Sequence, residues 1–102
     1  MGFLDILGFG NKTEQIKSFI EKGAVIIDVR SPGEFTSGHI KNSKNIPLGS
    51  ISSRVEEIQK LGKPIIVCCA SGMRSAQAAS ILKQNNIEVI NGGGWSSLER
   101  KL

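Results

Sequence analysis

The sequence contains few of the residues that metal sites and disulfide frameworks need. It has one histidine, and its only two cysteines, Cys68 and Cys69, are adjacent. Neighbouring cysteines cannot link distant parts of a chain, so we expect no disulfide framework and a reducing compartment, the cytoplasm. One histidine and an adjacent cysteine pair also cannot supply the ligands of a tetrahedral metal site. We therefore expect no metal and no other cofactor.

Aromatic residues are also scarce, and the positive charge is dispersed. The chain has no tyrosine and one tryptophan, and its 13 lysines and arginines contribute to a net charge of +4. The only adjacent cationic pair is Arg100 and Lys101. Nucleic-acid binding usually requires a basic stripe interleaved with aromatic residues, so we expect no nucleic-acid partner. The composition favours binding of small anions instead.

No apolar run is long enough to cross a membrane, so we expect no membrane span. Residues 1–11 include apolar side chains, but Asp5 and Gly8 interrupt them and no positive charge precedes them, unlike in a signal peptide. We interpret residues 1–11 as an apolar stub and residues 12–102 as one domain. A chain of 102 residues suits a single small core.

Short apolar runs alternate with helical patterns along the domain. The runs expected to form strands are residues 24–29, 44–48, 64–68 and 87–90, and the patterns expected to form helices are residues 12–22, 51–61, 74–86 and 95–102. We also expect a single helical turn after Ser31 and a turn at residues 91–94. Strands that are apolar on both faces are typical of a parallel sheet covered by helices on both sides, so the predicted fold class is α/β.

The segment CCASGMRS, residues 68–75, follows the third predicted strand and leads into a helix. Small residues in such a loop allow successive N–H groups to point inward and form an anion cradle. These N–H groups, the helix dipole and Arg74 would stabilise the thiolate of Cys69, which we expect to be the first residue past the strand. Cys68 continues the buried apolar run, so we expect it to pack in the core.

Two motifs, in this order, resemble those of the single-domain rhodaneses, which are sulfurtransferases. The first is IIDVRSPGEFTSGHIKNSKNIP, residues 26–47, and the second combines Cys69, Gly72, Arg74 and Ser75. The likeness covers residues 12–102. It implies the rhodanese-like fold, a small parallel five-stranded sheet with helices on both faces. It also implies that Cys69 is catalytic and accepts a sulfane sulfur as a persulfide.

The resemblance further implies the partners and the other site residues. The sulfur donor would be thiosulfate, a polysulfide or a persulfide, and the acceptor would be cyanide, a thiol or a protein. Backbone N–H groups of the loop would hold the terminal sulfur of the persulfide, and Arg74 would close the loop. The implied substrate-binding residues are Ala70, Ser71, Gly72, Met73, Arg74 and Ser75. Ala70 departs from the family pattern, because family members often carry a second cation directly after the cysteine.

Three polar residues outside the loop are expected to be structural. His39 lies within the first motif, and a thiolate formed by the cradle needs no histidine base. Asp28 and Arg30 end the first strong strand, where we expect them to fix the following turn.

The sequence is also compatible with two other functions. Cys68 and Arg74 have five residues between them, the spacing with which cysteine phosphatases bind phosphate. However, Gly72 is displaced from its usual place in that signature, and no acidic general acid stands near the loop. The other alternative is a non-catalytic sulfur carrier or binding module that docks on a larger protein. The sequence predicts no oligomeric state.

Overall fold

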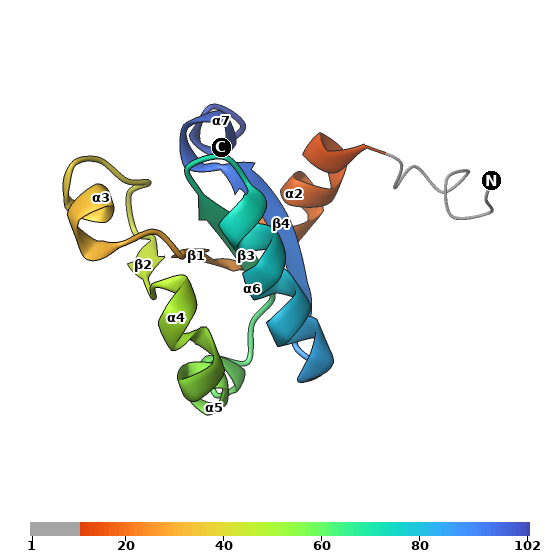
Figure 1. The fold of residues 1–102 in the computed structure, drawn as a ribbon. Helices are drawn as coiled ribbons and strands as arrows, with labels where there is room; N and C mark the ends of the chain where they lie inside the picture. The colour runs from red at the N-terminus through yellow and green to blue at the C-terminus, as the bar shows by residue number, and fades with distance from the viewer. Residues whose placement is uncertain (1–10) are drawn as a thin grey trace.

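A parallel β-sheet lies at the centre of the computed structural model, which describes residues 11–102 (Figure 1). Its strands are β1 (Val25–Asp28), β2 (Lys44–Asn45), β3 (Ile65–Cys69) and β4 (Val89–Gly94), in the order β2-β1-β3-β4. Every pair of neighbouring strands is parallel. Each predicted strand overlaps one of these four, and the predicted α/β class is confirmed.

The expected fifth strand is absent from residues 11–102, in which the sheet has four strands. Each apolar run of the domain supplies one strand, so no run is left to form another. The predicted stub lies outside the described residues except for Asn11. The Asn11 side chain accepts a 2.7 Å hydrogen bond from the N–H of Glu14 and so begins α2 (Lys12–Glu21).

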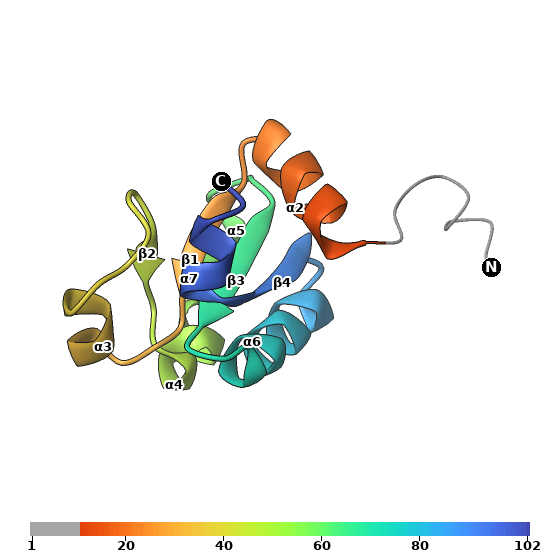
Figure 2. The same ribbon diagram turned by 90° about the horizontal axis from the view of Figure 1, so that it is seen from above.

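Helices cover both faces of the sheet (Figure 2). One face packs against α2 and α7 (Trp95–Glu99), and the other packs against α4 (Leu48–Ile51), α5 (Val55–Gln59) and α6 (Met73–Gln84). The short helix α3 (Pro32–Thr36) begins at a capping box between Ser31 and Glu34. None of the helices in the described part of the chain is long and apolar enough to span a bilayer.

The helix predicted over residues 51–61 is interrupted. The chain is already helical from Leu48, and a 3-10 turn at Ser52–Arg54 separates α4 from α5. The Ser53 hydroxyl donates a 3.0 Å hydrogen bond to the carbonyl of Ser50, and such side-chain bonds compete with the regular helical pattern. Ile51 and Ile58 are both buried, so the predicted apolar face is retained.

The turn predicted at residues 91–94 is wrong, because these residues continue β4. The register between β3 and β4 shifts after Val67, and Gly92 is the extra residue of the bulge. A Cβ atom on Gly92 would lie 2.9 Å from the side chain of Ile66, and one on Gly94 would lie 2.8 Å from the carbonyl oxygen of Ala70. The glycines therefore permit close approach of the strands and of the loop after β3.

Candidate active site

Cys69 lies at the carboxyl end of β3, in the interior of the sheet. We predicted that it follows the strand, but it is the last strand residue, because it is still paired with Gly94 of β4. Its side chain is fully buried. The chain then turns at Gly72, whose φ of 102° is in the left-handed region that glycine tolerates, and enters α6 directly. The predicted order of strand, loop and helix is confirmed.

Donors from the loop and from α6 surround the Cys69 sulfur. The N–H of Gly72 donates to Sγ at 3.0 Å, the N–H of Ser75 donates at 3.4 Å, and the Ser75 hydroxyl lies 3.3 Å away. Burial raises the pKa of the Cys69 thiol, and the hydrogen bonds from the hydroxyl and the N–H of Ser75 lower it. The N–H groups of Gly72 and Ser71 lower this pKa further, so the net shift is downward. The sulfur therefore ionises more readily than an ordinary cysteine.

The neighbouring Cys68 faces the opposite side of the sheet. Its side chain is fully buried in the apolar cluster beneath α2 and α7, together with Ile16 and Leu98. Burial and the charge of Asp28 raise the pKa of Cys68 to about 12. Cys68 is therefore a packed and protonated side chain, and the phosphatase spacing counted from it does not place its sulfur in the loop. This geometry does not favour a phosphatase.

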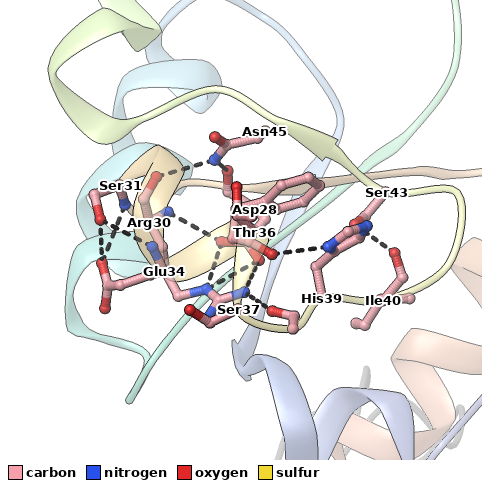
Figure 3. Close-up of polar contacts among 12 residues, drawn as sticks. Asp28, Arg30, Ser31, Glu34, Thr36, Ser37, His39, Ile40, Ser43 and Asn45 are labelled. Atoms are coloured by element: carbon pink, nitrogen blue, oxygen red, sulfur yellow. Dashed lines mark hydrogen bonds and ion pairs between the residues drawn. The ribbon is translucent and has the colours of Figure 1, made fainter.

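The Arg74 guanidinium is bound by Glu34 of α3. Its Nη1 and Nη2 atoms donate to the two carboxylate oxygens of Glu34, at 2.8 and 3.1 Å. Glu34 also accepts from the N–H and the hydroxyl of Ser31, at 3.1 and 3.0 Å (Figure 3). Arg74 and then Ser31 lower the pKa of Glu34 to about 2, so its carboxylate stays ionised. Glu34 was not predicted to belong to the site, because its spacing from Ser31 indicates only the start of a helix.

A buried ion pair holds the segment that leads from β1 to α3 (Figure 3). Arg30 donates from Nε and Nη2 to the Asp28 carboxylate at 2.7 to 3.0 Å, and its backbone N–H donates to the same carboxylate at 3.0 Å. Nη2 of Arg30 also donates to the Gly38 carbonyl at 2.6 Å, and the guanidinium lies 4.7 Å from the centre of the Trp95 ring. The prediction that Asp28 and Arg30 fix this turn is confirmed.

The contacts of His39 are with Phe35 of α3. The two rings are stacked with their centroids 3.8 Å apart, and Nδ1 of His39 lies 2.8 Å from the Phe35 carbonyl oxygen. These contacts fit the structural role that we predicted for His39. Across residues 11–102, no group of three or more histidine, cysteine, aspartate or glutamate side chains is arranged to hold a metal ion.

Asn91 of β4 completes the polar surroundings of the cradle, although its sequence pattern predicts only a turn. Its Oδ1 atom accepts from the Ser75 hydroxyl at 2.7 Å and from the N–H of Gly93 at 2.9 Å, and its Nδ2 donates to the Gly72 carbonyl at 3.1 Å. A single polar residue directly after a buried apolar run was the available signal. Such a residue needs partners in the fold, and here they belong to the loop.

The interior strand of this parallel α/β sheet ends in a buried cysteine of lowered pKa, and donors of the following loop surround its sulfur. These features define a protein with a cysteine-based anion cradle. Residues 12–101 match the family model described as Rhodanese-like domain, and the chain belongs to this family. The resemblance inferred from the two sequence motifs is confirmed.

Several proteins of similar sequence are named sulfurtransferases. The chain is 41% identical over 69 residues to thiosulfate sulfurtransferase GlpE of Pseudomonas syringae, and the matched region covers 68% of this chain and 64% of GlpE. It is 36% identical over 100 residues to tRNA sulfurtransferase of Thermoplasma acidophilum, and the matched region covers 97% of this chain and 20% of that protein. The uncharacterized protein YqhL of Bacillus subtilis is 44% identical over 62 residues, or 61% of this chain and 48% of YqhL. The chain spans less than two thirds of the length of each of these relatives.

Solved structures share the fold. A rhodanese-like domain protein from Staphylococcus aureus superposes with a TM-score of 0.70 at 30% identity, over 85% of this chain and 86% of that one. A rhodanese with anions from E. coli superposes with a TM-score of 0.65 at 31% identity, over 72% of this chain and 88% of that one. The four-stranded arrangement of residues 11–102 is thus a rhodanese-like α/β fold.

Proposed function

We propose that this protein is a rhodanese-type sulfurtransferase in which Cys69 carries sulfur as a persulfide. The observation that carries the proposal is the cradle, in which the N–H groups of Gly72 and Ser75 donate to the buried sulfur and lower the pKa of Cys69. A thiolate is the nucleophile that attack on a sulfane sulfur requires. Relatives named thiosulfate sulfurtransferase and tRNA sulfurtransferase support this class of reaction.

The proposed reaction balances without a cofactor. The Cys69 thiolate attacks the outer sulfur of a sulfane donor, a new S–S bond forms, and the S–S bond of the donor breaks. With thiosulfate, the electron pair leaves on sulfite and Cys69 becomes a persulfide anion. Cyanide or a thiolate then attacks the terminal sulfur, the product leaves as thiocyanate or as a new persulfide, and Cys69 returns to the thiolate.

In this mechanism the loop binds the terminal sulfur of the persulfide through its backbone. The proposed binding residues are Ala70, Ser71, Gly72, Met73, Arg74 and Ser75. Aligned N–H groups at the start of α6 stabilise an anion by hydrogen bonds and by the helix dipole, so no protonatable base is required. Arg74 holds the far end of the loop through its ion pair with Glu34.

The charges around the loop affect which sulfur donors can bind. Ala70 is uncharged, and the charge of Arg74 is balanced by Glu34. We therefore propose persulfides and polysulfides as donors beside thiosulfate, and thiols or proteins as acceptors. Both cysteines are free, and a reducing compartment, the cytoplasm, remains the proposed location.

Intact-mass analysis after treatment with thiosulfate or a polysulfide tests the proposal. We expect the wild type to gain one sulfur atom, which peptide mapping places on Cys69. Cys69→Ser should gain none. Cys68→Ala is the matched control on the other face of the sheet and should gain sulfur as the wild type does. No gain on Cys69 with any sulfane donor would exclude the proposed activity.

Turnover separates an enzyme from a sulfur carrier. We expect loaded Cys69 to transfer its sulfur repeatedly to cyanide or to a small thiol, measured as thiocyanate or as a new persulfide. Loading of Cys69 without transfer to any small acceptor would identify a carrier module that needs a protein partner.

A further inference from the structure

The side chain of Asn91 extends from β4 to the start of α6. Asn91 pairs with Val67 in the register of the sheet, and the bulge residue Gly92 follows it. The side-chain hydrogen bonds of Asn91 go to the surroundings of the cradle, namely to Ser75, Gly72 and Gly93. A half-buried polar side chain with this set of partners links β4 to the loop and to the helix at once.

The backbone determines how the Asn91 amide is oriented. The N–H of Gly93 can only donate and lies 2.9 Å from Oδ1, and the carbonyl of Gly72 can only accept and lies 3.1 Å from Nδ2. Turning the amide over would place donor against donor and acceptor against acceptor. Oδ1, an acceptor without a proton, is therefore the atom that faces the Ser75 hydroxyl at 2.7 Å.

The Ser75 hydroxyl has a single proton and two neighbouring acceptors. Its oxygen lies 2.7 Å from Oδ1 of Asn91 and 3.3 Å from Sγ of Cys69. When Cys69 is a thiol, its S–H donates to the Ser75 oxygen and the hydroxyl donates to Asn91. When Cys69 is a thiolate, the hydroxyl can donate to the sulfur only by giving up its bond to Asn91.

We propose that Asn91 is a positioning residue of the site, whose Oδ1 atom competes with the Cys69 sulfur for the hydroxyl proton of Ser75. The inference rests on the proposed function, in which that sulfur is the nucleophile. Asn91 stabilises the thiol form of Cys69 and offsets part of the effect of the N–H donors. Because the nucleophilicity of a thiolate falls as its basicity falls, this competition keeps the sulfur reactive as well as ionised.

A substitution at Asn91 leaves the other titratable groups near the cradle in place. On the neighbouring elements they are Arg74, Glu34, Cys68 and Asp28. From α2, Lys12 donates to the main-chain carbonyl of Asn91 at 3.1 Å, a bond that does not involve the side chain. The Gly72 carbonyl also keeps its bond from the N–H of Ala76, at 3.0 Å, so the loop retains its connection to α6 when the Asn91 amide is removed.

Two substitutions at Asn91 should move the pKa of Cys69 in opposite directions. The readout is the ultraviolet absorbance of the thiolate against pH, measured in the Cys68→Ala background so that only one thiol titrates. Asn91→Leu removes the competing acceptor, so the pKa should fall by about one unit, the size expected for one hydrogen bond to a charged sulfur. Asn91→Asp introduces a stronger acceptor that carries a negative charge, so the pKa of Cys69 should rise by about one unit or more.

A purely structural role for Asn91 predicts a different result. Loosening of the loop would weaken the N–H donors and raise the pKa of Cys69 in both variants, and that outcome would overturn the proposal. An unchanged pKa in either variant would also overturn it. If Asn91→Leu does not fold, as judged by circular dichroism, Asn91→Ala takes its place, since it also removes the acceptor, and a pKa that stays constant or rises there contradicts the competition.

The Ser75→Ala background supplies the second test. Because Asn91 is proposed to act through the Ser75 hydroxyl, Asn91→Leu should leave the pKa of Cys69 unchanged once that hydroxyl is gone. A shift of the same size with and without Ser75 would overturn the proposal. These titrations need no sulfur transfer, so they decide the role of Asn91 even if the wild type fails to load sulfur, which would refute the proposed function alone.

Discussion

Glu34 and Arg74, 40 residues apart in the sequence, form an ion pair with two hydrogen bonds that joins α3 to the start of α6. The side chains are 38% and 39% exposed, so solvent screening leaves the pair only a small contribution to the free energy of unfolding. Its larger effect is on the electrostatic potential beside the cradle, because the carboxylate cancels the charge of the only arginine in the loop.

Removing Arg74 and removing Glu34 should shift the preference for anionic sulfur donors in opposite directions. Arg74→Ala leaves the Glu34 carboxylate unpaired, so the KM for the thiosulfate dianion should rise roughly threefold or more, a change of the size that one added charge near a surface produces. Glu34→Gln frees the guanidinium, so the KM for thiosulfate should fall. Steady-state kinetics with thiosulfate and with a neutral organic trisulfide measure the difference between the donors.

The control for this comparison is Glu57→Gln. Glu57 forms an exposed ion pair with Arg54 in the α5 region, and its loss should leave both KM values unchanged. Equal losses for both donors in Arg74→Ala would show that Arg74 acts by holding the loop and not through its charge.

Sulfur loading should follow the ionisation of Cys69. Its rate should increase with pH and level off above a pKa that lies below the usual thiol value of about 8.5. Cys68, with a pKa of about 12, should not contribute near neutral pH. Mass spectrometry of samples quenched at several pH values measures the rate, and a midpoint at or above the value of a free thiol would contradict the role of the cradle.

The same ionisation should appear in stability. The unfolded chain keeps the Cys69 proton to higher pH than the folded protein does, so the free energy of unfolding should rise with pH between the two pKa values. This contribution is complete above the unfolded pKa and is lost as pH falls through the folded one. The raised pKa of Cys68 makes stability fall with pH over the same range, so the comparison uses the Cys68→Ala background. Urea unfolding should show the rise in Cys68→Ala and not in the double variant Cys68→Ala, Cys69→Ser.

Gly94→Ala should damage both the fold and the site. The new Cβ atom would lie 2.8 Å from the backbone oxygen of Ala70, which follows Cys69, so we expect a destabilisation of about 1 to 3 kcal/mol and slower sulfur loading. Gly33→Ala is the control, since no atom lies within 4 Å of the added methyl. Urea unfolding and loading assays compare the two, and a Gly94→Ala variant equal to the wild type would show that the loop adjusts freely.

An aryl phosphate should not be hydrolysed above background. The loop donors converge on the sulfur of Cys69, whereas Cys68 is buried on the other face of the sheet. A chromogenic phosphate ester assayed with the wild type, Cys68→Ser and Cys69→Ser tests this. Turnover that survives in Cys69→Ser and disappears in Cys68→Ser would support a phosphatase instead.

Local patterns predicted most elements because neighbouring residues decide them. Ser31 and Glu34 are three residues apart and form the predicted capping box. The apolar run that precedes Cys69 and the small residues that follow it correctly predicted a strand, then a loop and a helix. The bulge at Gly92 was not predictable, because it depends on how closely β4 approaches Ile66 and Ala70. The assignment of residues 91–94 to a turn failed for this reason.

The site was predicted in its local part and missed in its distant part. The loop residues that contact the Cys69 sulfur follow it in the chain, and they were all identified from the sequence. Glu34 and Asn91 reach the loop from α3 and from β4, and only the folded arrangement brings them there. Their own neighbours in the sequence indicate a helix start and a chain turn, which are local features without a link to the cradle.

The opposite orientation of Cys68 and Cys69 also determines how the protein responds to oxidants. Hydrogen peroxide would convert the Cys69 thiolate to a sulfenic acid, which is usually rescued by condensation with a second thiol. Cys68 is the only other cysteine in the sequence, and its sulfur points away through the thickness of the sheet. A disulfide between the two would require the strand to break, so recovery of an oxidised Cys69 depends on a thiol that comes from outside the chain.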